Sequence, residues 1–165
     1  MLTHLLPSRR LSLTVAAPPP LVAQRLANAI APYSTGLKLW RSPDKPFIGD
    51  AGEDGFEIRR HIRYRNSFLP IVTGQYAVTA EGTRITVTMQ IHPIVLAFMG
   101  IWSSFWFIPV TMMLAATSGS ERLLILFALL APLLFLVIIH KVFNWEANQA
   151  EIFLRQTLLS HPVNR

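Results

Sequence analysis

The sequence predicts an α+β membrane protein, in which an antiparallel sheet carries helices on one face and a two-helix transmembrane hairpin precedes a C-terminal helix. Residues 94–143 are almost entirely apolar, several earlier segments alternate apolar and polar residues, and the later segment repeats apolar residues at helical spacing. Hydrophobic residues make up 52% of the 165 residues and the mean hydropathy is +0.39, which is high for a soluble protein. We therefore expect a cytoplasmic α+β domain in residues 1–93, the hairpin in residues 94–143, and a cytoplasmic helix in residues 144–165 that packs on the first domain.

The hairpin consists of two apolar segments joined by a short polar connector. Residues 94–116 contain no charged side chain in 23 positions. A helix of this length is about 34 Å long, enough to cross the hydrocarbon core of a bilayer. Residues 117–122 form the connector, and residues 123–143 form the second segment, near whose end the amine of Lys141 can reach the interface. Because the connector has only six residues, the two helices should be antiparallel neighbours.

The distribution of basic residues predicts the orientation of the hairpin. Residues 1–93 carry 11 of the 15 Lys and Arg residues, whereas the connector holds only Arg122. Since basic segments stay on the cytoplasmic side, both termini should be cytoplasmic in a multi-pass protein of the inner (cytoplasmic) membrane. The first 15 residues lack an apolar core long enough for a signal peptide, and their charges follow the short apolar stretch instead of preceding it. We therefore expect an uncleaved N-terminus.

Residues 1–93 show the alternation of an antiparallel sheet with one covered face. The predicted strands are residues 9–15, 56–65, 68–80 and 83–91. The pair Glu81-Gly82 between the last two strands is typical of a tight turn. A helix is predicted at residues 21–31, with prolines at its start. Residues 32–54, rich in Pro, Gly and Asp, indicate a loop with room for one short strand at residues 37–40.

The C-terminal segment predicts a helix over residues 144–160 with one apolar stripe. The stripe consists of Phe143, Ala147, Ala150, Leu154 and Leu158. This helix and the helix at residues 21–31 are the expected cover of the apolar face of the sheet.

The order of elements resembles the helix-grip domains of lipid- and hydrophobic-ligand-binding proteins, or a small PH-like sheet, and this likeness concerns the fold alone. A second resemblance rests on residues 56–70, which match F-x-I-x-R-x-I-x-Y-R-N-S-F-L-P and are followed by Gly74. This pattern, within about 40 residues, is similar to small uncharacterised bacterial two-span membrane proteins, and it implies a bacterial membrane protein without implying an activity.

Motifs of known catalytic chemistry are missing from the sequence. It has no phosphate-binding Gly-rich loop, no nucleophile elbow and no His pair at metal-ligand spacing. With no cysteine, it has no disulfide framework, no thiol nucleophile and no Cys-based metal site. Asp50, Glu53 and Asp54 cluster but lack the spacing of a calcium loop, which favours a solvated loop. We therefore expect a non-enzymatic protein with no metal or cofactor.

The first predicted span carries an aromatic cluster at membrane depth, where aromatic belts are not expected. The cluster consists of Phe98, Trp102, Phe105 and Trp106. Packing on lipid or on the second helix is the simpler interpretation, and contact with another membrane protein or a flat hydrophobic cofactor is the functional one. On another side, small residues permit close helix packing. These small residues are Ala97, Gly100, Ser104 and Thr111.

One histidine lies within the second span. His140 could ligate a haem or chlorophyll-type cofactor, bond a neighbouring helix or extend to the interface, and the polar interhelical contact is the default among these.

A basic sheet face is the other candidate surface, and its members are Arg59, Arg63, Arg65 and Arg84. It could be a solvated face, a contact for anionic lipid headgroups, or a docking surface for an acidic protein. Nucleic acid does not fit, because no aromatic platform or recognition helix accompanies these arginines.

The stretch Asn66-Ser67-Phe68-Leu69-Pro70 follows the basic strand. Short polar side chains indicate a turn at Asn66-Ser67, and Pro70 favours an edge or bulge. Together these features predict an accessory or structural subunit that packs against other proteins of a larger membrane complex, for example a respiratory or photosynthetic one. The alternative is a membrane-tethered module that binds a lipid or another hydrophobic ligand.

Overall fold

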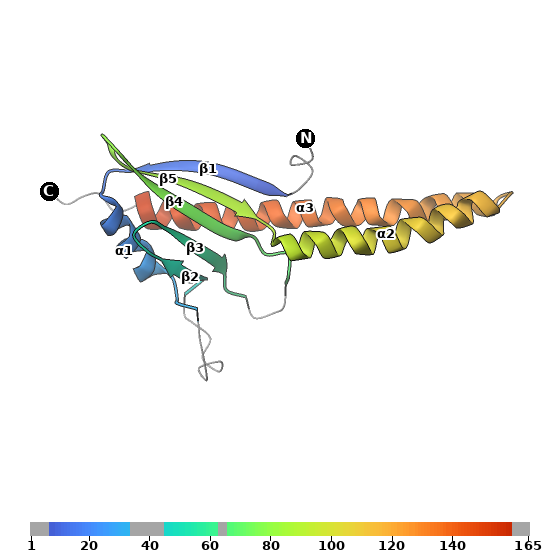
Figure 1. Cartoon of the computed structure of the whole chain (residues 1–165), viewed down its shortest axis with the longest axis horizontal. Helices are drawn as coiled ribbons and strands as arrows, with labels where there is room; N and C mark the ends of the chain where they lie inside the picture. The colour runs from blue at the N-terminus through green and yellow to red at the C-terminus, as the bar shows by residue number, and fades with distance from the viewer. Residues whose placement is uncertain (1–6, 34–44, 63–65, 160–165) are drawn as a thin grey trace.

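The computed structural model of this chain describes residues 7–33, 45–62 and 66–159. The elements in chain order are β1 (Ser8–Val15), α1 (Pro19–Ala29), β2 (Phe47–Ala51), β3 (Gly55–Arg60), β4 (Ile71–Thr79), β5 (Gly82–Gln90), α2 (Pro93–Ala116) and α3 (Glu121–Leu159). The strands form one five-stranded sheet in the order β1-β5-β4-β3-β2, and every pair within it is antiparallel. The fold is therefore α+β, with two helices long and apolar enough to cross a membrane (Figure 1).

Both α1 and α3 pack on the apolar face of the sheet, as predicted. The predicted stripe of α3 is buried completely, with its five side chains at most 1% exposed. In the core they join the inward side chains of β5, which alternate with exposed or half-buried polar residues. These inward residues are Thr83, Ile85, Val87 and Met89. The core thus lies between the two helices and one face of the sheet, and the described residues leave the other face of the sheet open.

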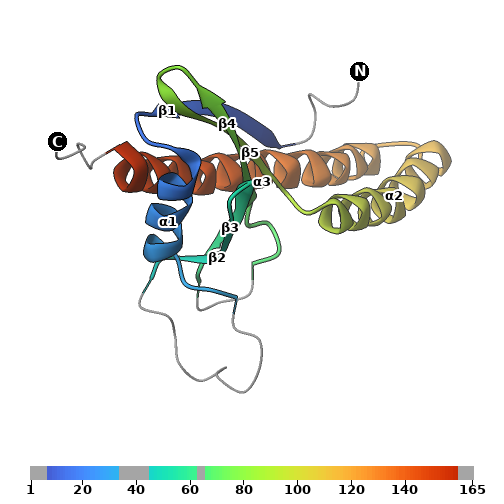
Figure 2. The same cartoon turned by 60° about the vertical axis from the view of Figure 1, so that its left-hand side comes forward.

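The third helix runs without a break from the hairpin into the sheet domain. It has 39 residues, so it is about 58 Å long, and Figures 1 and 2 show it spanning the whole molecule. The expectation of a separate C-terminal helix after residue 143 is therefore wrong. No glycine or proline follows Pro132 within the helix, so nothing in residues 143–145 interrupts the i→i+4 hydrogen bonds.

The strand boundaries differ from the predicted ones around the open edge of the sheet. β3 ends at Arg60 and β4 begins at Ile71, so both strands are shorter than expected. The short strand β2 lies in a segment predicted to be a loop. Its polar and glycine residues hide the alternation, and pairing with β3 and the bridge between Ala31 and Ile48 stabilise it. Residues 37–40, Arg63 and Arg65 lie outside the described residues.

Two glycines occupy positions that demand glycine. Gly82 has φ +126° after the two-residue turn that joins β4 to β5, which confirms the tight turn predicted at Glu81-Gly82. Gly74 pairs with Phe56 across the sheet, and a Cβ there would lie 2.1 Å from a carbon of the Phe56 ring. The ring therefore covers the glycine backbone, which holds β3 against β4.

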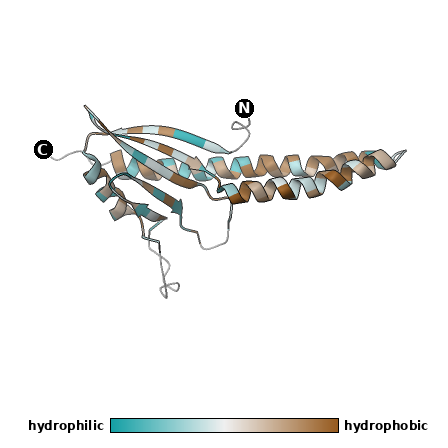
Figure 3. Cartoon of the chain, in the orientation of Figure 1, coloured by the Kyte–Doolittle hydropathy of each residue, from teal (hydrophilic) through white to brown (hydrophobic). Residues whose placement is uncertain are grey.

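The hairpin projects from one end of the sheet. α2 begins directly after β5, where the His92 side chain caps the helix by accepting a hydrogen bond from the Ile94 amide at 3.1 Å. Figure 3 shows hydrophobic residues dominating α2 and the part of α3 beside it. Most side chains of the hairpin are exposed, apart from those along the line where α2 meets α3.

Candidate functional site

The junction between the sheet and the hairpin is the part of the structure where polar and aromatic side chains converge. Its first member is an ion pair between Arg60 on β3 and Glu146 on α3. The Nη1 atom of Arg60 lies 3.0 and 3.2 Å from the two carboxylate oxygens, and Glu146 is only 2% exposed. The guanidinium also stacks on the Trp145 ring at 5.0 Å. Because an unpaired buried carboxylate is costly, this contact determines which face of α3 meets β3.

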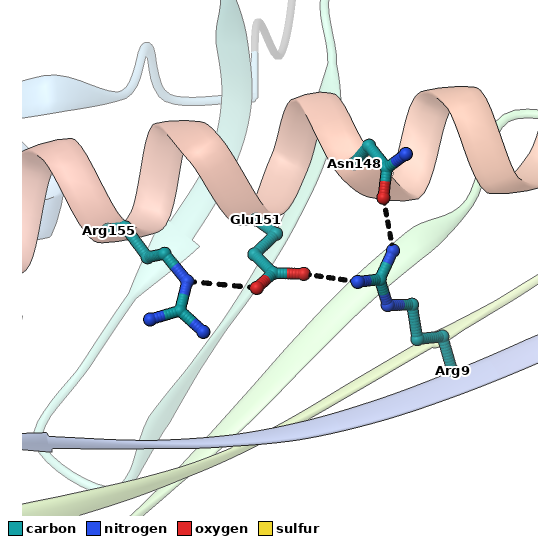
Figure 4. Close-up of polar contacts among 4 residues, drawn as sticks. All are labelled: Arg9, Asn148, Glu151 and Arg155. Atoms are coloured by element: carbon teal, nitrogen blue, oxygen red, sulfur yellow. Dashed lines mark hydrogen bonds and ion pairs between the residues drawn. The ribbon is translucent and has the colours of Figure 1, made fainter.

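A second polar contact ties α3 to the opposite edge of the sheet (Figure 4). Arg9 on β1 donates to the Asn148 side chain and to the carboxylate of Glu151. The same carboxylate accepts from Arg155 one turn later along α3, at 2.8 Å. The helix is thus bound through side chains to β1 on one side and β3 on the other. These contacts connect the position of α3 directly to that of the sheet.

An aromatic contact line continues from the sheet domain into the hairpin. Phe68, in the connection between β3 and β4, meets Phe135 of α3 edge to face, with ring centroids 6.2 Å apart. Phe135 also contacts Trp102 of α2 at 5.5 Å, and Trp102 stacks on Trp106 at 6.0 Å. Asn66 orients this connection, because its side-chain oxygen accepts from the Phe68 amide at 2.9 Å. The turn predicted at Asn66 is therefore present, within a ten-residue connection rather than a tight hairpin.

The indole of Trp106 compensates for a proline in the neighbouring helix. Pro132 has no N–H, so the carbonyl of Ala128, four residues earlier, loses its helical donor. Trp106 Nε1 donates to this carbonyl at 3.0 Å. The bond between the two helices therefore satisfies the carbonyl that Pro132 leaves without a helical donor.

The structure divides the predicted aromatic cluster into two pairs. Trp102 and Trp106 are 40% and 36% exposed because they pack against α3. Phe98 and Phe105 are 65% and 76% exposed and point away from the rest of the chain. Helix packing, the simpler interpretation, therefore applies to the tryptophans. A contact of the phenylalanines with another protein remains a prediction.

The small-residue stripe of α2 also faces away from α3. Ala97, Gly100, Ser104 and Thr111 are all exposed, and a Cβ on Gly100 would touch nothing within 4 Å. The hydroxyls of Ser104 and Thr111 donate to carbonyls of their own helix at 2.8–3.0 Å. The outward face of α2 therefore carries small side chains, has no free hydroxyl donor at Ser104 or Thr111, and has no partner among the described residues outside α2.

Two members of the predicted basic face, Arg59 and Arg84, lie within the described residues. Arg59 and Arg84 both lie on the open face of the sheet, but at opposite ends of it. Arg59 lies near the end of β3 that is level with Gln90, the last residue of β5. Arg84 is six residues before Gln90, so it is about 20 Å farther from the hairpin along the strands. Arg60 points to the opposite face, into the ion pair with Glu146.

The remaining predicted residues do not form a site within the described ranges. His140 is exposed on α3, beside the buried Ile139, and its role as a cofactor ligand stays a prediction. Asp50 lies on β2, and Glu53 and Asp54 form the exposed turn after it. Across residues 7–33, 45–62 and 66–159, no three His, Asp or Glu side chains gather as metal ligands would.

Among the described residues, one buried polar side chain of the core lacks a hydrogen-bond partner. The hydroxyl of Tyr76 on β4 is buried and has no hydrogen-bond partner in the described part of the chain. Because burial disfavours the phenolate, the pKa of Tyr76 is raised from 10.0 to about 12. Its ring packs at 6.1 Å from Phe56, so the residue contributes mainly as an aromatic core side chain.

The residues that build the junction include two that sequence analysis missed, Arg60 and Glu146. The sequence did indicate the position of Arg60, because Arg60 follows Phe56 and Ile58 at every second residue and so lies on the same inward face of β3. An arginine at an apolar position indicates a buried carboxylate opposite it. Which carboxylate, however, depends on how α3 lies across the sheet.

Neither the protein-family models nor the curated proteins or solved structures contain a match to this chain.

Proposed function

We propose that this chain is an integral protein of the bacterial inner membrane, with α2 and the first part of α3 crossing the bilayer. In the most apolar stretches of these helices, only 6% and 17% of residues are buried inside the chain. Core helices of a soluble protein would be mostly buried. The excess of Lys and Arg outside the connector supports cytoplasmic termini on both ends.

The proposed role is that of a non-enzymatic accessory subunit, which packs against other membrane proteins and braces them from the cytoplasmic side. The observation behind this proposal is the outward face of α2. It combines the small residues from Ala97 to Thr111 with the exposed rings of Phe98 and Phe105. Small residues let another helix approach closely, and the phenylalanines would then pack at the flanks. The ion pairs on α3 would transmit the position of such a helix to the sheet domain.

The alternative role, as a lipid- or hydrophobic-ligand-binding module, requires space inside the sheet domain. The stripe of α3 fills the apolar face of the sheet with side chains that are at most 1% exposed. Within the described residues, the buried hydroxyl of Tyr76 is the interior feature in favour of a polar guest. The packed interior makes the accessory role the better supported of the two.

Co-purification with a matched pair of variants tests the proposal. Gly100→Leu would place a large side chain on the outward face of α2, and Ala131→Leu would do the same on an exposed position of α3. Purified in mild detergent from its native membrane, the wild-type chain and Ala131→Leu should retain a stoichiometric partner that Gly100→Leu loses. A wild-type chain that purifies without any stoichiometric partner would refute the accessory role.

A further inference from the structure

A shallow depression lies on the open face of the sheet, at the end from which the hairpin projects. It has a volume of about 330 Å³ and is lined by Tyr33, Glu57, Arg59, Ile71 and His92. Ile71 begins β4 and pairs with Gln90 at the end of β5, and His92 caps α2. The depression therefore borders the point where the chain leaves the sheet and enters the first apolar helix.

Its level relative to a bilayer follows from this position. α2 begins at Pro93 and is apolar throughout, so His92 marks the boundary of the hydrocarbon region when the hairpin spans a membrane. The depression then lies within the layer of lipid headgroups. This step rests on the membrane placement proposed above, and on nothing else in the proposed accessory role.

Arg59 is the principal group of the depression. Its guanidinium lies 4.9 Å from the centroid of the Tyr33 ring, which holds the guanidinium plane in place. No carboxylate in the described part of the chain forms an ion pair with Arg59. Its guanidinium shares a hydrogen bond with Tyr33, which leaves most of its five N–H donors unused among the described residues. A preoriented guanidinium with free donors is suited to a phosphate, whose oxygens can accept two parallel hydrogen bonds.

Two further donors stand beside the guanidinium. The Nδ1 atom of His92 accepts from the Ile94 amide, so the N–H of this ring is on Nε2, where it can donate outward. The Tyr33 hydroxyl lies 3.4 Å from a carboxylate oxygen of Glu57, a long and weak contact. A tyrosine hydroxyl is protonated at neutral pH, and burial raises the pKa of Tyr33 further above 10.0, so the hydroxyl keeps its proton.

Glu57 is the one acidic group lining the depression, and it limits the charge of a suitable ligand. Its carboxylate opposes any anion bound by Arg59, and a doubly charged phosphate monoester suffers more from this repulsion than a singly charged diester. The diester is the form of phosphate in phospholipids. The charge of the depression, the geometry of its donors and its position beside α2 therefore all favour the phosphate diester of a phospholipid.

We propose that this depression binds the phosphate diester of an anionic phospholipid from the adjacent leaflet, with Arg59 as the main contact and His92 and Tyr33 as additional donors. The open face thus has one defined lipid site next to α2, in place of a diffuse basic surface.

The test measures lipid bound to the full-length protein in detergent by native mass spectrometry, with phosphatidylglycerol as the anionic probe and phosphatidylcholine as the zwitterionic one. Arg59→Gln should lower the apparent affinity for phosphatidylglycerol about fivefold, the effect of one basic residue near a membrane surface. Glu57→Gln should raise it, because repulsion is removed. Arg84→Gln, on the same face but at the far end, is the matched control and should leave it unchanged.

Several outcomes would overturn the proposal. Equal losses in Arg59→Gln and Arg84→Gln would mean that the binding is diffuse, and no loss in Arg59→Gln would mean that the depression is not the site. Glycerophosphoglycerol, the phosphate diester that remains when phosphatidylglycerol loses its acyl chains, should bind far more weakly, and equal binding would exclude a lipid as the source. Unchanged thermal unfolding of each variant shows that the fold is intact. The membrane placement is tested separately, by whether the protein leaves the membrane only when detergent is added. If it does so but the lipid tests fail, the lipid site is refuted and the membrane placement stands.

Discussion

The bond between Trp106 and Ala128 gives the sharpest prediction about the hairpin. Trp106→Phe keeps an aromatic ring but removes the indole N–H, so the carbonyl that Pro132 leaves free loses its donor. Hydrogen bonds between helices in membranes contribute about 0.6 kcal/mol on average and up to ~1.7 kcal/mol. Because this carbonyl has no helical donor to replace the indole, we expect the upper part of that range, about 1–1.5 kcal/mol, plus roughly 0.5 kcal/mol for the smaller ring.

The second half of this experiment uses Pro132→Ala. Alanine restores an N–H that can bond to the Ala128 carbonyl within the helix, so the indole is no longer needed. In the Pro132→Ala background, Trp106→Phe should therefore cost only the packing part, about 0.5 kcal/mol. The coupling free energy of the double-mutant cycle should be about 1 kcal/mol, measured by unfolding of the hairpin in mixed micelles.

Trp102→Phe serves as the control for this cycle. Its ring stacks on Trp106 and contacts Phe135, but its indole donates no hydrogen bond in the described structure. The free energy of unfolding lost in Trp102→Phe should be the same whether position 132 holds proline or alanine. A coupling near zero between Trp106→Phe and Pro132→Ala would show that the indole does not replace the missing N–H, and the reasoning would fail.

Three further predictions concern the sheet domain, each followed by thermal or denaturant unfolding in detergent. Arg60→Ala should destabilise the fold by about 3 kcal/mol, because it leaves the buried carboxylate of Glu146 without its partner; a loss below 0.5 kcal/mol would mean that the pair is not formed. Asn66→Ala should cost about 1 kcal/mol through loss of the bond to the Phe68 amide, whereas Asn66→Asp should retain most of the stability. For Tyr76, the folded pKa of about 12 exceeds the unfolded value of 10.0, so the unfolded chain ionises first and stability should fall as pH rises from 10 to 12. Tyr76→Phe should abolish this contribution and leave stability at pH 7 equal or higher; an absorbance titration at 295 nm without a late component near pH 12 would contradict the burial argument.

Much of the fold was predictable because the deciding patterns are local. The alternation of β5, the tight turn at Glu81-Gly82 and the two apolar segments each depend on residues close in sequence. The buried stripe of α3 was predicted residue by residue from its spacing alone. The continuity of α3 was missed, because the apolar composition changes near residue 143 and suggested two elements where the backbone forms one.

The candidate site was less predictable, because it depends on pairs of residues far apart in the chain. Arg60 and Glu146 are 86 positions apart, and Arg9 and Glu151 are 142 apart. A periodicity shows which face a side chain lies on, but it does not show which side chain of another element lies opposite. For the same reason the alternation did not show that Arg59 and Arg84 stand at opposite ends of the open face.

The sequence by itself determined the classes of structure in this protein: an alternating sheet with one apolar face, an apolar hairpin, and a helix whose stripe covers that face. These follow from the periodicity of apolar residues and from the free energy of removing them from water. Only the tertiary structure decided that α3 is a single helix joining hairpin and sheet. Only it paired the Trp106 indole with the carbonyl freed by Pro132, and placed Arg59 beside the start of α2. Those features arise where separate elements meet, and their energies depend on distances and directions that no local pattern records.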